Sequence, residues 1–440
     1  MANAGESIYH VPLQSLAHFH IGWGSECSTV QITWDVIMSA TESELRRSVY
    51  SLLLVNTFIF YVGTVVCFSG VYFASSMIGT GEGDILDRVC RIDGRYYEGI
   101  ATAGYSHRDH GVTNLAFFPG YPLLVAGVSR TSGLSVKVAM LVVSNLMGLI
   151  GVLLWTLWLR CEAGAALSDD DIQSSVIAIA FYPAGFFLRI AYSESLCFCL
   201  IAFFCLAISY RWHPLGVAVI AGIITGVRPV GIAATVVACI YSMQWWCRPW
   251  NRLAGAACIL PVASSGLLCF VAYQWLAFGD PWCFVRSQQA VHYRVPATSW
   301  EKPVRMLALE PVWGAYVTGS RAYWKNLPHR STAPFDMQSM NPIYFSAAVA
   351  LLAFATYARL LAWKFILMGW VLLLVPYWMR GFELYMGSQG RFAILAFPQF
   401  VAMAVVMRTI PRWLTVLYCS VSAILLFCHS VVFALGYFVI

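Results

Sequence analysis

The chain has 440 residues, of which 60% are hydrophobic and only 11% are charged, and its mean hydropathy is +0.70. Soluble domains carry about 25% charged residues, so the composition excludes an ordinary soluble protein and predicts an all-α polytopic membrane protein. The formal net charge of +6 is modest, and lysine and arginine are spread along the chain. The chain has no basic block of the kind that indicates nucleic-acid binding.

The first 47 residues are polar and mixed in character, so we expect a cytoplasmic arm over 1–47 and no cleavable signal peptide. The remainder, 48–440, is predicted to form one transmembrane domain. Its apolar runs lie at 48–76, 115–130, 136–159, 172–188, 192–210, 214–246, 253–278, 342–363, 364–379, 392–407 and 412–438. Several reach the ~20 residues that a spanning helix needs. We therefore expect about eleven transmembrane helices, with the long run at 214–246 divided by Arg228-Pro229.

Lysine and arginine in short loops predict the orientation in the membrane. With eleven spans, most of these lysine and arginine residues fall on the cytoplasmic side. The loops 77–114, 279–341 and 380–391 then share the opposite side. The first of these loops is expected to be catalytic, and the second to form a cap. No Asn-x-Ser/Thr site occurs in the chain, which favours a bacterial plasma membrane over the endoplasmic reticulum.

The stretch 90–105 places an acidic residue in an apolar stripe. If it is helical, one face carries Leu86, Val89, Asp93, Tyr97 and Ile100. A second face then carries Asp87, Arg91, Arg95 and Glu98, spaced for ion pairs. A carboxylate among apolar neighbours is costly unless something uses or satisfies it. Asp93 is therefore the leading candidate for a functional residue.

Four further charged residues have apolar flanks, and each has a purely structural alternative. Glu194 either contributes to the site or pairs with the nearby Arg189 at a helix junction. Arg228, inside a hydrophobic stretch, either binds an anionic headgroup or extends to an interface. Asp280, before a proline, either shapes the site or forms a turn. Arg391 either contacts a ligand or is a solvated loop residue.

Together these residues favour a site for a sugar attached to a polyprenyl phosphate. Arginines suit a phosphate, the isoprenoid tail would lie in the bilayer, and the sugar would lie beneath the loops. A carboxylate with a raised pKa could take the proton from an acceptor hydroxyl that attacks the anomeric carbon. The departing lipid phosphate is a stable anion, so arginine could stabilise it without a metal or other cofactor.

Several motifs, in this order, resemble those of the PIG-V-type mannosyltransferases, which belong to the GT-C class of membrane glycosyltransferases. They are Arg91-Ile-Asp-Gly-Arg-Tyr-Tyr-x-x-Ile-Ala-x-x-Gly-Tyr, Phe117-Phe-Pro-x-Tyr-Pro, Tyr192-Ser-Glu-Ser, Gly226-x-Arg-Pro-x-Gly, Gly279-Asp-Pro and Ser388-x-x-Arg-Phe. The resemblance extends over residues 48–410. Two departures concern the residues before Asp93, where the family commonly has tryptophan, and the proline that follows Arg228.

The resemblance implies a GT-C-like helical bundle whose first extracytoplasmic loop carries the catalytic acid, at Asp93. It also implies a polyprenyl- or dolichyl-phosphate-mannose donor, a lipid or glycan acceptor, and inversion at the anomeric carbon. The residues expected to bind substrate are Arg91, Arg95, Tyr97, Glu194, Arg228, Asp280 and Arg391. The alternative from another class is a polytopic transporter or lipid flippase, which would also carry charges within its membrane helices.

Overall fold

The computed structural model describes residues 27–78, 84–106, 113–163, 167–246, 248–291, 300–320 with 323, 337–382 and 385–436. Within these ranges the regular structure is entirely helical, which confirms the predicted all-α class. The chain divides into two compact units, Met1–Ser51 and Leu52–Ile440, and the second holds every residue of the site described below. Residues 1–26 of the predicted arm and parts of both predicted loops lie outside the described residues.

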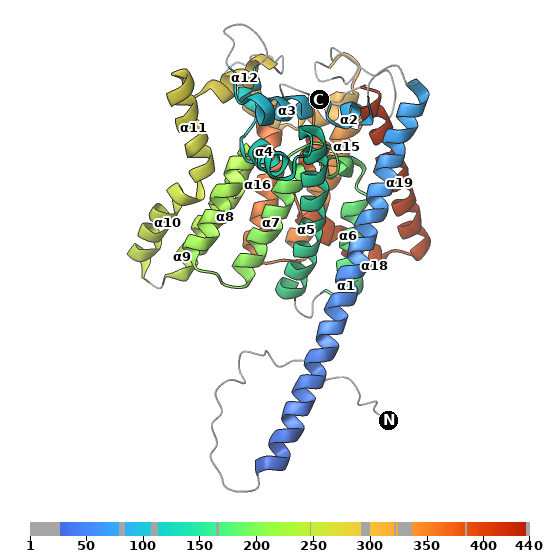
Figure 1. The fold of residues 1–440 in the computed structure, drawn as a ribbon, viewed down its shortest axis with the longest axis vertical. Helices are drawn as coiled ribbons and strands as arrows, with labels where there is room; N and C mark the ends of the chain where they lie inside the picture. Colours follow the sequence, from blue (N-terminus) through green and yellow to red (C-terminus); the bar gives the residue numbers. More distant parts are fainter. Residues whose placement is uncertain are drawn as a thin grey trace. The chain divides into compact units, whose positions relative to one another are not determined.

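The helices follow one another as labelled in Figure 1. The α-helices are α1 (Cys27–Ile78), α2 (Ile85–Val89), α3 (Asp93–Ala103), α4 (Gly120–Ser132), α5 (Val136–Ala163), α6 (Asp169–Ala180), α7 (Glu194–Ser209), α8 (Pro214–Val227), α9 (Ile232–Trp245), α10 (Pro249–Ala263), α11 (Ser265–Phe278), α12 (Cys283–Val291), α13 (Glu301–Leu307), α14 (Glu310–Trp313), α15 (Met337–Tyr357), α16 (Trp363–Arg380), α17 (Gln389–Ala393), α18 (Pro398–Thr409) and α19 (Arg412–Ala434). Short 3₁₀ helices are η1 (Asn114–Ala116), η2 (Pro183–Leu188), η3 (Pro229–Gly231) and η4 (Gly314–Tyr316).

Four described helices are long and apolar enough to cross a membrane, namely those containing Ser48–Met77, Val136–Glu162, Ser339–Tyr357 and Arg412–Ala434. The pair α10 and α11, bent by 52°, is a fifth candidate. The chain is thus an integral membrane protein, with fewer full-length spans among its described helices than the eleven expected. Helices α7, α8 and α9 are apolar but have only 14 to 16 residues. Hydropathy alone does not separate such short buried helices from true spans.

The centre of the second unit is formed by α5 and α7, which pack along each other. Helix α7 is buried on nearly all sides, which explains why its sequence is apolar all round. Trp155 and Trp158 of α5 meet the ring of Phe397 edge-on, at 5.8 and 5.3 Å between ring centroids. The Trp155 indole donates a hydrogen bond of 3.0 Å to Ser175 Oγ on α6. This packing joins α5 to α6 and to the residue that precedes α18.

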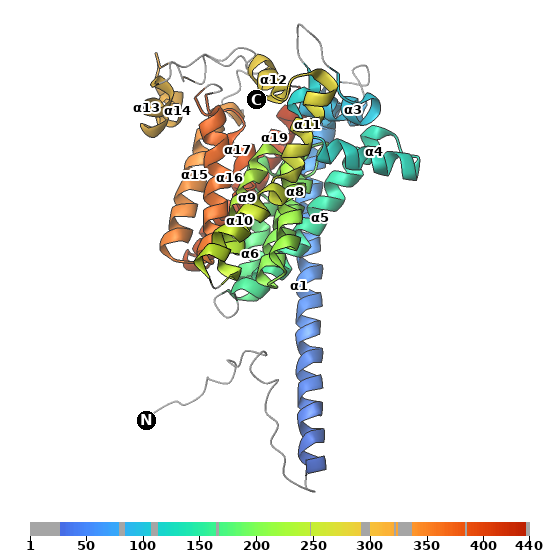
Figure 2. The same ribbon diagram turned by 90° about the vertical axis from the view of Figure 1, so that its left-hand side faces the viewer.

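The described parts of the two predicted loops gather at one end of this unit. Helices α3 and α12 lie at the same end in both views (Figures 1 and 2). The hydroxyls of Thr113 and Ser287 are 2.6 Å apart, so the loops contact each other directly. Gln274 of α11 donates to the carbonyl of Leu115 at 3.1 Å and accepts from the backbone of Phe284 at 3.0 Å. One buried amide therefore links η1 to α12.

Candidate functional site

Asp93 is the first residue of α3, and the continuous helix expected around it is wrong. Helix α2 ends at Val89 and α3 begins at Asp93. Between them Ile92 has φ 59° and ψ −111°, which is an unfavourable conformation for a β-branched residue. Backbone strain of this kind is typical of functional sites. The break turns α3 so that the Asp93 side chain, 20% exposed, reaches Arg391.

Tyr97, one turn along α3, lies beside Asp93 and is buried. Its hydroxyl is 2.9 Å from Ser193 Oγ. Burial raises the pKa of Tyr97 to about 12, and this effect exceeds those of the charged groups nearby. The phenol is therefore protonated at neutral pH, so it can donate a hydrogen bond and is not a base.

Glu194 begins α7 and is fully buried. Its Oε1 forms ion pairs with both Arg228 and Arg391. The alternative that Glu194 pairs with Arg189 is wrong, because the Arg189 guanidinium donates to the carbonyls of Ala180 and Gly185, at 2.9 and 2.7 Å. A buried carboxylate is costly unless paired, and here one carboxylate oxygen pairs with two arginines at once.

Arg228 lies between α8 and η3, where Pro229 ends the helix. Its backbone is extended, with φ −152° and ψ 146°, as a residue before proline prefers. The side chain is 9% exposed, donates to Ser193 Oγ at 3.3 Å and lies 5.3 Å from the ring centre of Phe392. Arg228 therefore points into the bundle and does not extend to an interface.

Arg391 lies on α17 and is 5% exposed. Its Nη1 is 2.5 Å from Asp93 Oδ2, and its Nε pairs with Glu194. The guanidinium also lies 4.6 Å from the ring centre of Tyr192. Burial lowers the pKa of Arg391, but Glu194 and Asp93 together raise it well above the ordinary value. The group is therefore a permanent cation that bridges two carboxylates, and not a solvated loop residue.

The backbone before Arg391 is held in place on both sides of Gly390. The Gly390 N–H donates to Asn341 Oδ1 at 2.9 Å, and its carbonyl accepts from the Tyr182 hydroxyl at 3.0 Å. A Cβ at Gly390 would lie 2.6 Å from Tyr344 Cδ2, so only glycine fits without movement. Ser388, just before α17, has φ 60°. This close packing fixes the direction in which Arg391 points.

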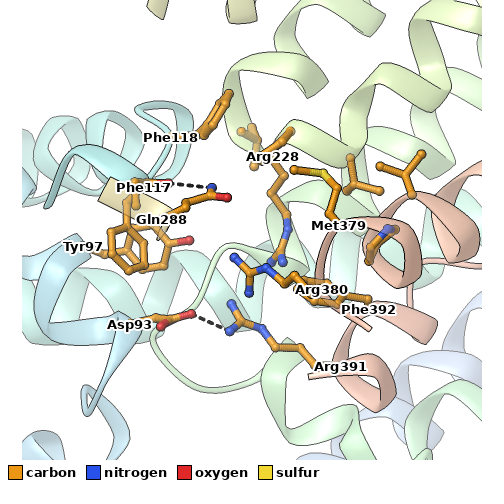
Figure 3. Close-up of a pocket in the computed structure, with 16 residues that line it drawn as sticks. Asp93, Tyr97, Phe117, Phe118, Arg228, Gln288, Met379, Arg380, Arg391 and Phe392 are labelled. Atoms are coloured by element: carbon orange, nitrogen blue, oxygen red, sulfur yellow. Dashed lines mark hydrogen bonds and ion pairs between the residues drawn. The ribbon is translucent and has the colours of Figure 1, made fainter. Parts of the chain in front are cut away.

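A cavity of about 80 Å³ brings these residues together. Figure 3 shows the guanidinium groups of Arg228, Arg380 and Arg391 facing the same space, with Asp93 and Tyr97 on the opposite wall. The remaining lining residues are Ala116, Phe117, Phe118, Val227, Pro229, Val230, Gln288, Val375, Pro376, Met379 and Phe392. Counting Glu194 behind the wall, three arginines face two carboxylates. Among the described residues, arginine therefore predominates at this site, which suits an anion.

Three of the residues predicted to bind substrate lie elsewhere. Arg91 lies against the backbone of Gly436, and its carbonyl accepts a hydrogen bond from Tyr192. Arg95 is exposed on α3. Asp280 accepts from the backbone of Trp282 at 3.0 Å and pairs with Arg286 at 3.0 Å. This geometry matches the turn that was the structural alternative for Asp280, and none of the three lines the cavity.

Arg380, Gln288 and Ser193 belong to the site but were not singled out from the sequence. Arg380 ends α16, immediately after an apolar run, and this position was its only local signal. Gln288 lies on α12, in the predicted cap. Ser193 belongs to the Tyr192-Ser-Glu-Ser motif, in which Glu194 drew attention first. Within the described ranges, no group of three or more His, Cys, Asp or Glu side chains could hold a metal ion.

No protein-family model and no curated protein matches the chain. Among solved structures, the chain is similar to the oligosaccharyltransferase of Archaeoglobus fulgidus. The apo form aligns with 87% of this chain and 56% of its own, at 10% identity and a TM-score of 0.44. The same protein in complex with an inhibitory peptide and a dolichol-phosphate aligns with 87% and 55%, at 9% identity and a TM-score of 0.43. This chain spans a little over half the length of those chains.

Proposed function

We propose that the protein is a membrane glycosyltransferase that moves mannose from a polyprenyl- or dolichyl-phosphate donor to a lipid or glycan acceptor. One observation carries the proposal. Asp93, Glu194, Arg228 and Arg391 belong to separate motifs of the sequence, and they converge at a single cavity. A carboxylate facing several arginines suits an acid–base reaction on a phosphate ester. The motif resemblance to PIG-V-type mannosyltransferases supplies the sugar and the class of donor.

The reaction we propose is a single displacement with inversion. An oxygen of the acceptor hydroxyl attacks the anomeric carbon, while the bond from that carbon to the phosphate oxygen breaks. The electron pair of the broken bond stays on the lipid phosphate, and Asp93 takes the proton of the hydroxyl. Arg228, Arg380 and Arg391 stabilise the negative charge on the phosphate. The protonated Tyr97 hydroxyl donates a hydrogen bond beside the reacting groups.

The ion pair between Arg391 and Asp93 gives the donor phosphate a second role. A carboxylate paired with a cation at 2.5 Å is a weak base, because the ion pair favours its charged form. A phosphate anion in the cavity would compete with Asp93 for the same guanidinium. Donor binding would then loosen the ion pair and make Asp93 a stronger base. In this proposal, binding of the donor phosphate frees Asp93 from Arg391, so that Asp93 can take the proton of the acceptor hydroxyl.

The proposal is tested with the protein in sealed vesicles and polyprenyl phosphate carrying radiolabelled mannose, together with candidate lipid and glycan acceptors. A transferase yields labelled acceptor and free polyprenyl phosphate. A flippase, the alternative from the sequence, moves the intact labelled donor across the bilayer and forms no new bond. Movement of intact donor without any transfer would overturn the proposal. We place the cavity on the non-cytoplasmic face, as lysine and arginine in the short loops predict, and cysteine labelling from each side of the vesicle tests this.

A further inference from the structure

Ser193 has the position of a helix cap but does not cap its helix. It immediately precedes α7, and a serine at such a position usually accepts a hydrogen bond from a backbone N–H of the first turn. The Ser193 side chain makes no bond of this kind. It is fully buried, and its Oγ lies 2.9 Å from Tyr97 Oη and 3.3 Å from Arg228 Nη1. The hydroxyl is therefore turned toward two residues that line the cavity.

The chemistry of these groups determines the direction of both hydrogen bonds. A guanidinium group donates and cannot accept, so Arg228 is the donor to Ser193 Oγ. Among the described residues, the Ser193 side chain has no hydrogen-bond partner besides Arg228 and Tyr97, and Glu194 Oε2 makes no hydrogen bond to it. If Tyr97 donated to Ser193, the single proton of this buried hydroxyl would have no acceptor, which is costly. Ser193 therefore donates to Tyr97 Oη.

The ring of Tyr97 is held by aromatic neighbours. Phe117 and Tyr121 meet it edge-on, at 5.3 and 5.1 Å between ring centroids, and Tyr192 does so at 6.5 Å. The position of Oη is therefore fixed, and only the direction of its proton remains to be set. A phenolic O–H lies near the plane of its ring, in one of two opposite directions, because the oxygen is conjugated with the ring. Since Ser193 donates from one side, the Tyr97 proton points to the other.

We propose that Ser193 is a positioning residue, which is oriented by Arg228 and holds the Tyr97 proton toward the phosphate of the donor. The inference rests on the proposed function and extends it to a serine that does not line the cavity. Tyr97 lies on the wall that faces the guanidinium groups (Figure 3). Its Oη is joined to Arg228 through one intervening oxygen. An anion bound by Arg228 is therefore within reach of the Tyr97 proton.

The hydrogen bond from Ser193 also makes Tyr97 a stronger donor. A hydroxyl that accepts a hydrogen bond is polarised, and its own proton then forms a stronger bond. When the bond to the anomeric carbon breaks, negative charge grows on the phosphate oxygen, and the Tyr97 proton stabilises this charge. No covalent bond of Ser193 or Tyr97 changes in this step. The contribution of Ser193 should therefore appear in kcat more than in the KM for the donor, and only when the Tyr97 hydroxyl is present.

The first test is a double-mutant cycle on mannose transfer. Tyr97→Phe removes one donor to a developing anion, and we expect kcat to fall by about 100-fold. Ser193→Ala should lower kcat by about 5- to 10-fold, within the range for two hydrogen-bonded neighbours. In the Tyr97→Phe background, the same Ser193→Ala change should alter kcat by less than about twofold. An equal effect of Ser193→Ala in both backgrounds, or no effect in either, would overturn the inference.

The matched control is Ser195→Ala. Ser195 lies in the first turn of α7, is as buried as Ser193, and its hydroxyl makes no hydrogen bond within the part of the chain that the structure describes. Its replacement should change kcat by less than about twofold, and a loss equal to that of Ser193→Ala would refute a specific role for Ser193. If Ser193→Ala does not fold, Ser193→Gly takes its place in the cycle, because glycine also lacks the hydroxyl and suits the residue before a helix.

The second test does not depend on transfer. Binding of undecaprenyl phosphate is measured for the wild type, Tyr97→Phe, Ser193→Ala and the double variant, with undecaprenol as the ligand that lacks phosphate. A loss of undecaprenyl phosphate affinity in Ser193→Ala that disappears in the Tyr97→Phe background supports the inference, even if the wild type transfers no mannose and the proposed function fails. Transfer of mannose with independent effects of the two variants would refute the inference and leave the proposed function standing. Equal losses of affinity for both ligands, or no binding of undecaprenyl phosphate by the wild type, would also refute it.

Discussion

Arg391 Nη1 lies 2.5 Å from Asp93 Oδ2, although 298 residues separate them along the chain. The pair joins the start of α3 to α17, and the Nε of the same guanidinium reaches Glu194 at the start of α7. Asp93 and Glu194 are the first residues of their helices, and Arg391 lies on the short helix α17. The site is therefore assembled from helix ends, which packing of the long helices brings together.

Replacement of Asp93 by asparagine should abolish most transfer without loss of folding. The amide keeps an oxygen that can accept from Arg391 but cannot take a proton. We expect the rate to fall by about 10²- to 10⁴-fold, the usual contribution of a general base. The measurement is mannose transfer in membranes with matched protein levels. The control is Asp87→Asn on α2, which removes a 2.5 Å ion pair with Lys137 of α5. Full activity of Asp93→Asn with a competent donor and acceptor would refute the base assignment.

Replacement of Glu194 by glutamine should destabilise the protein. It leaves Arg228 and Arg391 buried with less compensating charge, and breaking a buried ion pair costs about 3–5 kcal/mol. The matched variant is Glu98→Gln, which loses a partly exposed ion pair of 3.6 Å with Lys137 and should cost no more than about 1 kcal/mol. Thermal unfolding of both variants in the same detergent provides the comparison. A melting temperature for Glu194→Gln equal to that of Glu98→Gln would contradict this account of the buried cluster.

Replacement of Arg380 by glutamine should weaken donor binding. A hydrogen bond to a charged group contributes about 1.5–3 kcal/mol, so the donor KM should rise by about 10- to 100-fold. Arg286→Gln is the control, because that arginine is 71% exposed and pairs with Asp280 outside the cavity. Steady-state kinetics with varied donor separate the effects on KM and kcat. An unchanged donor KM in Arg380→Gln would exclude this arginine from phosphate binding.

Replacement of Gly390 by alanine should impair transfer by moving Arg391. The added Cβ would lie 2.6 Å from Tyr344 and 3.1 Å from Asn341 Oδ1, so α17 must shift. A displacement of about 1 Å at a catalytic group can cost about 10²-fold in rate. Gly99→Ala on α3 is the control, because its Cβ would meet no atom within 4 Å and alanine favours a helix by about 0.5–1 kcal/mol. If the two variants transfer mannose equally well, the close packing at Gly390 does not position Arg391.

The sequence was sufficient to nominate the charged residues of the site but not their partners. Asp93, Glu194, Arg228 and Arg391 each stand out as a charge with apolar flanks. Spacing alone, however, offered Arg189 as an alternative partner for Glu194, whereas the Arg189 guanidinium donates to backbone carbonyls. Local spacing describes neighbours on one helix. Contacts over hundreds of residues depend on how the helices pack, and that information is not local.

The helix break before Asp93 was also hidden. Periodicity predicted one continuous helix through Ile92, which has a positive φ that a β-branched residue disfavours. Tertiary contacts override this preference, and they also change the ion pairs expected on this segment. Asp87 and Glu98, expected to pair with Arg91 and Arg95, both lie against Lys137 of α5. The all-α class needed less information, since composition and the apolar runs already predict it.

Glu194 also constrains how this protein can evolve. Because the buried Glu194 carboxylate pairs with both Arg228 and Arg391, loss of Glu194 would leave two buried arginines with less compensating charge. A lineage that alters this cluster one residue at a time must pass through a less stable ancestor. We therefore expect neutral drift to be slow here and replacements to occur as coordinated exchanges. Substitutions at these three positions, which lie far apart in the sequence, would then occur together.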